Sequence, residues 1–169
     1  VLNPLIANPN ARWLVYLSDP VGNTFGPSGN LLSSGNLAIW GRNYPTAVAE
    51  AGNRYVFSNP GTVTVTTTDA SKTYGDAAID LSVNFTLLGK PVEAGNYGNV
   101  YLNSTGIDIF STGPTVASTG NTAIANAGAY SITGTGTANT GYSLVLNNSG
   151  QLTVGTRPIT VSGDNQSRV

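Results

Sequence analysis

The sequence predicts a mainly β protein, and three observations support this fold class. The polar residues are mostly Thr, Asn and Ser (21, 19 and 15 residues, beside 21 Gly), while only 9% of the chain is charged, against roughly 25% in an average soluble domain. Thr favours strands, and Gly and Asn favour the turns between them. Short apolar or alternating segments recur along the chain, and only one segment has helix signals. We therefore expect at most one or two short helices.

Residues 1–61 are expected to form a β-rich N-terminal unit. Residues 13–17 are apolar on both faces, which predicts a strand that is covered on two sides. Further short strands are predicted at 37–43 and 54–57. Residues 45–52 are the helix candidate, because Pro45 suits a first helical turn and Gly52 a C-terminal stop. A turn at 59–61 ends this unit.

Residues 62–157 are expected to form a second β-rich module in tandem with the first unit. The module opens with alternating Val and Thr over 62–68, and the clearest strand covers 79–88, where five apolar residues alternate with polar ones. Further strands are predicted at 99–103, 106–111, 129–136, 142–148 and 151–155. Short strands at this regular spacing predict an immunoglobulin-like sandwich or a β-grasp-like repeat domain.

The last residues of the chain repeat the beginning of this module. Ile159, Thr160 and Val161 match Val63, Thr64 and Val65 ninety-six positions earlier. Solenoid repeats have periods of about 20–50 residues, so this period indicates a repeated domain. Residues 158–169 are therefore predicted to be the first strand of the next repeat, with neighbouring repeats as partners. An alternative is that this strand closes the sheet of the present module.

A sequence motif at both ends of the module resembles a known family. Lys72, Tyr74 and Gly75 stand at its start, and its end carries Gly150, Leu152, Thr153, Val154 and Pro158. This pattern resembles the YGX-type MBG repeats of very large bacterial exoproteins. Residues 1–61 resemble the segment before such repeats in filamentous-haemagglutinin-like adhesins of two-partner secretion, at the junction after an upstream shaft.

The resemblance implies a secreted or surface-attached bacterial adhesin that takes part in cell or host adhesion or in biofilm. It implies no ligand and no catalytic residue. Lys72, Tyr74 and Gly75 are structural motif residues: we expect Tyr74 to pack at the module junction and Gly75 to supply a backbone angle that other residues resist.

Charge and composition argue against several other functions. A net charge of −1 with seven scattered basic residues does not fit nucleic-acid binding, and no apolar run reaches the length of a membrane span. Without His or Cys, the usual catalytic triads and zinc sites cannot form. We expect no enzyme activity, no cofactor and no metal. Calcium near Asp69 or Asp164 and an isopeptide bond at Lys72 remain open alternatives.

The expected function is structural: a stiff stalk that holds a binding region away from the cell. The alternative is a module that recognises host or matrix glycans, or mucin, through loop aromatics. Trp40, Tyr44 and Tyr97 are the candidate ligand-binding residues, because they lie in or near turn-rich segments. Trp40 also has a structural interpretation, as part of the core of the first unit.

Overall fold

The computed structural model describes residues 11–26, 31–87, 90–91, 100–101, 106–164 and 166. Its described elements are eleven strands and one helix of a single turn, so the predicted mainly β fold class is confirmed. The strands form four small sheets. The immunoglobulin-like or β-grasp-like form of the module stays a prediction.

The first unit is built around a parallel pair of short strands. β1 (Leu14–Leu17) pairs with β2 (Arg54–Phe57), and Ile39 bonds to β2 through a hydrogen bond from the Phe57 amide of 2.7 Å. Val15 and Leu17 pack against one buried cluster and Leu14 and Tyr16 against another. The prediction that this strand is covered on both faces is confirmed. No regular strand forms at 37–43: only residues 37 and 39 form isolated β-bridges, and Ile39 pairs with Val56 of β2.

The helix predicted at residues 45–52 is wrong. Pro45 follows a cis peptide bond in a turn that the Thr46 amide closes by donating to the carbonyl of Asn43 at 2.9 Å. The carbonyls of Val48 and Glu50 accept hydrogen bonds from the guanidinium of Arg12, where a helix would have used backbone amides. A long-range side-chain contact therefore replaces the local helical hydrogen bonds.

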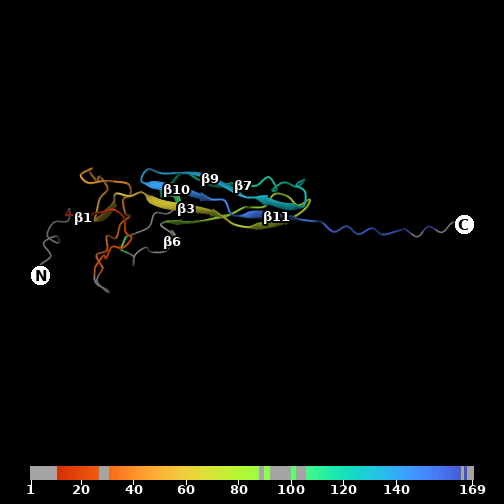
Figure 1. Ribbon diagram of the computed structural model, residues 1–169, viewed down its shortest axis with the longest axis horizontal. Helices are drawn as coiled ribbons and strands as arrows, with labels where there is room; N and C mark the ends of the chain where they lie inside the picture. The colour runs from red at the N-terminus through yellow and green to blue at the C-terminus, as the bar shows by residue number, and fades with distance from the viewer. Residues whose placement is uncertain are drawn as a thin grey trace.

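Two long segments run side by side through the module. β3 (Gly61–Thr67) continues into β4 (Ala70–Thr73), and β10 (Tyr142–Asn147) continues into β11 (Gln151–Gly155). β3 pairs with β10 and β4 with β11, both in parallel. Figure 1 shows these segments lying along the long axis of the molecule.

The remaining strands flank these two segments. β5 (Val83–Leu87) is antiparallel to β3 and also pairs with β6 (Lys90–Pro91), while β8 (Gly128–Ser131) is antiparallel to β11. β7 (Phe110–Ala117) and β9 (Thr133–Ala138) form a separate ribbon. The helix α1 (Gly106–Ile109) directly precedes β7.

Three predicted strands differ in their limits. The strand predicted at 79–88 is regular only from Val83, because Ile79 and Leu81 pack against a separate cluster around Ile132 and Leu152. The strand predicted at 106–111 is α1 followed by the start of β7. The strand predicted at 129–136 is divided into β8 and β9 at the fully buried Ile132.

One buried cluster crosses the predicted boundary at residue 61. It joins Trp40 and Phe57 of the first unit to Val63, Val65 and Leu87 of the module. Only Ser58, Asn59 and Pro60 separate β2 from β3. The division into two units stays a prediction, but residues on its two sides share a core.

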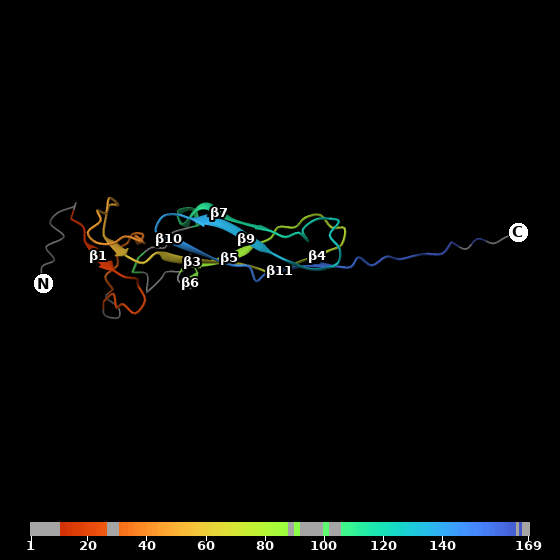
Figure 2. The same ribbon diagram turned by 45° about the horizontal axis from the view of Figure 1, so that its top comes forward.

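The chain leaves the module at the end opposite to β1. Residues 156–164 extend away from β11 in Figures 1 and 2. Within these residues there is no strand, and Ile159 and Val161 are 84% and 87% exposed. The alternative that residues 158–161 close the sheet of this module is therefore wrong.

Candidate functional site

Trp40 lies in the core and presents no open ring face. Its side chain is only 6% exposed, with the ring of Phe57 at 4.5 Å and that of Tyr101 at 6.2 Å between centroids. The structural interpretation of Trp40 is therefore the one that the packing supports. Tyr97 lies outside the described residues.

Tyr44 is the candidate aromatic that the structure leaves accessible. It is 76% exposed and forms an edge-to-face contact with Tyr16, with ring centroids 5.4 Å apart. Tyr16 was not among the predicted residues. The alternation along residues 13–17 could have indicated it, because Tyr16 lies on the face of β1 opposite to Trp13.

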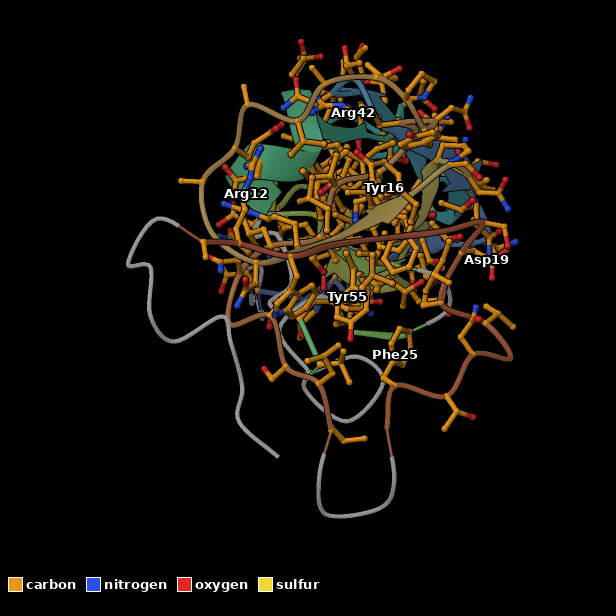
Figure 3. The ribbon with its side chains drawn as sticks, turned by 90° about the vertical axis from the view of Figure 1, so that its left-hand side faces the viewer. Arg12, Tyr16, Asp19, Phe25, Arg42 and Tyr55 are labelled. Atoms are coloured by element: carbon orange, nitrogen blue, oxygen red, sulfur yellow. The ribbon has the colours of Figure 1, made fainter. Side chains whose placement is uncertain are left out.

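On the other side of β1 and β2, Phe25 and Tyr55 border a small pocket (Figure 3). Its volume is about 280 Å³, and Val15, Leu17 and Leu32 contribute to its mostly apolar lining. The Tyr55 hydroxyl donates to the carbonyl of Leu32 at 2.6 Å, and burial raises the pKa of Tyr55. The Tyr55 hydroxyl of this pocket thus already has a protein partner.

The charged residues of the first unit, labelled in part in Figure 3, serve its own structure. Arg42 binds both carboxylate oxygens of Glu50, at 2.8 and 3.0 Å, and Arg12 binds the carbonyls of Val48 and Glu50. Burial alone would raise the pKa of Glu50, but hydrogen bonds from its own backbone and from Arg42 hold it below its ordinary value. This cluster ties residues 42–50 to Arg12, just before β1.

The motif residues lie together at the opposite end, where the chain leaves the module. Lys72 is 8% exposed, and its Nζ donates to the carbonyls of Asp76 and Thr122, each at 2.8 Å. Gly75 has φ of +88°, which confirms the expected backbone angle. Tyr74 is 45% exposed.

Arg157 completes this group of residues, although the sequence did not indicate it. Its Nε donates to the carbonyl of Tyr74 at 2.8 Å, and its guanidinium also pairs with the carboxylate of Asp76. Arg157 lies eighty-three positions after Tyr74 and eighty-one after Asp76. At this separation, no local sequence pattern could have indicated the contact. Only the parallel pairing of β4 and β11 brings these residues together.

Replacing Lys72 by Met should destabilise the module. The substitution keeps the buried stem but removes two partly buried hydrogen bonds from a charged donor, at an expected cost of about 1–3 kcal/mol in the free energy of unfolding. Urea unfolding measures this cost, and Ser71→Ala, at the exposed neighbouring position, is the control. Equal stability of Lys72→Met and the wild type would contradict a structural role for Nζ.

Asp76 should make the stability of the module depend on acid pH. The hydrogen bond from the Thr73 amide, followed by the charge of Arg157, holds the pKa of Asp76 below its ordinary value against the opposing effect of burial. Its contribution is therefore present above the unfolded pKa of about 3.9 and is lost as pH falls through the lower folded-state pKa. The stability difference between the wild type and Asp76→Asn should shrink between about pH 5 and pH 2. A difference that stays constant over this range would contradict the assignment.

The described residues hold no group of three or more Asp, Glu, His or Cys side chains that could bind a metal ion. The Asp69 carboxylate accepts a hydrogen bond of 2.8 Å from the Gln151 amide, so it supports the β4–β11 pairing. No helix in the described part of the chain is long and apolar enough to cross a membrane.

Comparison with known proteins gives no match: no family model, no curated protein and no solved structure is similar to this chain. The resemblance to MBG repeats and to filamentous-haemagglutinin-like adhesins therefore stays a prediction from the motif residues.

Proposed function

We propose that the chain is a non-catalytic stalk region of a large secreted or surface-attached bacterial adhesin. The observation that carries this proposal is the elongated arrangement, in which β1 lies at one end and the chain departs from β11 at the other (Figures 1 and 2). Such an arrangement suits repeats that are joined end to end. The adhesin context rests on the resemblance of Lys72, Tyr74 and Gly75 to the repeat motif, and neighbouring repeats are the expected partners.

The strand pairing supports a mechanical role. β3 starts at one end of the module and β11 stops at the other, and the two segments are paired in parallel over six residue pairs in β3–β10 and four in β4–β11. A force between the two ends pulls these segments in opposite directions along their length. The hydrogen bonds between them lie across that force. Many bonds must therefore break together before the module extends.

Single-molecule pulling with two attachment geometries tests the proposal. The chain contains no Cys, so introduced cysteines define where force is applied. Pro60→Cys with Ser162→Cys loads the parallel segments lengthwise, whereas Pro60→Cys with Thr140→Cys peels β3 from β10 at their common start. We expect a clearly higher rupture force in the first geometry. Equal forces in both geometries would contradict a load-bearing role.

Tyr44, which is exposed and contacts the half-buried Tyr16, favours a second candidate function, recognition of a host or matrix glycan. An accessible tyrosine ring can stack on the apolar face of a sugar. A glycan and mucin array with the wild type and Tyr44→Ala separates the two functions. Binding that is lost in Tyr44→Ala would support recognition by this surface, and absence of binding would leave the structural function as the better proposal.

A further inference from the structure

The start of the module is covered by an aromatic residue followed by a glycine. Trp40 and Gly41 lie where β3 and β10 begin, against Gly61 and Gly141. A Cβ at Gly141 would stand 2.6 Å from the carbonyl oxygen of Trp40, and one at Gly61 would stand 3.1 Å from the Trp40 ring. Gly41 has φ of +66°. An aromatic-glycine turn thus packs closely on two glycines at the start of a module.

The opposite end of the module carries a second pair of this kind, but an exposed one. Tyr74 is followed by Gly75, which has φ of +88°, and the Gly75 amide donates to the carbonyl of Ala123 at 3.1 Å. Tyr74 is 45% exposed, and Ile124, next to Ala123, is 84% exposed. We define the end face as Tyr74, Gly75, Ile124 and Arg157.

The segment that leaves the end face has the residues of a buried strand. Ile159 and Val161 match Val63 and Val65 of β3, which are 0% and 1% exposed because they pack in the buried cluster with Trp40, Phe57 and Leu87. In residues 158–161 the same residue types stand in solvent. The strands that would bury them are those of a following module of the same kind.

The link between β11 and Ile159 is short, so a following module would have to lie close to the end face. Only residues 156–158 separate the end of β11 from Ile159. Three residues span at most roughly 10 Å. Arg157, in the middle of this link, is held to the carbonyl of Tyr74 and to Asp76, which fixes the direction in which the chain departs.

We propose that the end face is a docking surface for the start of a second module of this kind. In this contact, Tyr74 and Gly75 take the place that Trp40 and Gly41 have at the start of the present module, but Arg157 stands at the position of Gly61, so the close packing of an aromatic ring on that glycine is not repeated. The inference rests on the proposed stalk function and adds to it a defined, stiff junction between repeats.

A tandem protein tests this inference: residues 1–161 are joined to residues 66–157, which preserves the ninety-six-residue spacing. Tyr74→Ala is introduced in the first copy, where a module follows. The matched control carries Tyr74→Ala in the second copy only, where none follows. Thr112, which is exposed, is replaced by Cys in both copies, and a spin label is attached to each Cys. The two labels report the distance between the modules and the spread of that distance.

We expect the substitution in the first copy to broaden the distance distribution and to lower the Tm by roughly 4–8 °C relative to the control. Equal effects of the two substitutions would overturn the docking inference, because Tyr74 would then act only within its own module. The second copy lacks Trp40 and Phe57, so the end face must supply the cover that these residues give to the first copy. A long but broad distance in the unsubstituted tandem, or a second copy that circular dichroism shows to be unfolded, would also overturn docking while leaving the stalk function intact. A short distance, with the modules folded back on each other, would contradict the stalk function itself.

Discussion

Replacing Phe57 by Ala should lower the free energy of unfolding by about 3–5 kcal/mol, the usual cost of removing a fully buried aromatic ring. Phe57 is 0% exposed, and its ring contacts those of Trp40 at 4.5 Å and Tyr101 at 5.6 Å. These neighbours come from separate parts of the chain and cannot easily close the space that is left. Urea unfolding of the variant and the wild type measures the effect.

Tyr44→Ala is the matched control, because this exposed aromatic should change stability by no more than about 0.5–1.5 kcal/mol, through its contact with Tyr16. The same experiment tests the boundary at residue 61. Both tryptophans lie in the first unit, so their fluorescence reports on that unit, while far-UV circular dichroism reports on all the strands. A shared core predicts that Phe57→Ala shifts both transitions together. A shift in fluorescence alone would contradict it and show that the first unit unfolds separately.

Replacing Gly141 by Ala should destabilise the protein by roughly 2–4 kcal/mol, from backbone strain and overpacking together. Gly141 has φ of +92°, and its added Cβ would meet the carbonyl oxygen of Trp40 at 2.6 Å. That carbonyl is part of the backbone and cannot rotate away as a side chain could. Thermal or urea unfolding measures the loss.

Gly22→Ala isolates the strain contribution to this loss. Gly22 has φ of +74°, but nothing lies within 4 Å of the position that its Cβ would take. The difference between the two variants therefore measures the close approach of Trp40 to the start of the module. Equal destabilisation by both substitutions would show that this contact is not tight in solution.

The strands that local pattern alone determines were predictable. β3 follows the alternation of Val and Thr, with buried and half-buried residues in turn along its length. The absence of strand structure at residues 79–82 was not predictable, because the alternation of apolar and polar residues there continues into β5. The side chain of Asn121 binds both the amide and the carbonyl of Ile79, at 2.9 and 2.8 Å, and so takes the place of a neighbouring strand. This contact joins positions that are forty-two residues apart.

In the candidate site, too, features that depend on neighbouring residues could be predicted, and features that depend on contacts between distant residues could not. The positive φ of Gly75 could be predicted, because a Tyr-Gly turn has a local signature. The burial of Trp40 could not be decided from its turn-rich neighbourhood, since the residues that cover it include Tyr101. The interaction of Arg157 with Asp76 depends on two strands that meet only in the folded chain.

The parallel pairing of the two long segments is interrupted once, between β3 and β4 on one segment and between β10 and β11 on the other. This interruption restricts where insertions and deletions can be accepted. Between the pairs Thr66–Asn147 and Ala70–Leu152, one segment has three residues and the other has four. Gly150 absorbs the additional residue: its amide donates to Thr67 Oγ1 at 2.9 Å, and a Cβ there would stand 2.8 Å from the Thr67 backbone. A length change at this point would shift every pair beyond it.

Related repeats should therefore keep the spacing from β3 to β4 and from β10 to β11. For divergent copies of this module, the conserved interval between a Val-Thr strand and its Lys-x-Tyr-Gly turn would be a better guide to homology than overall length or percentage identity.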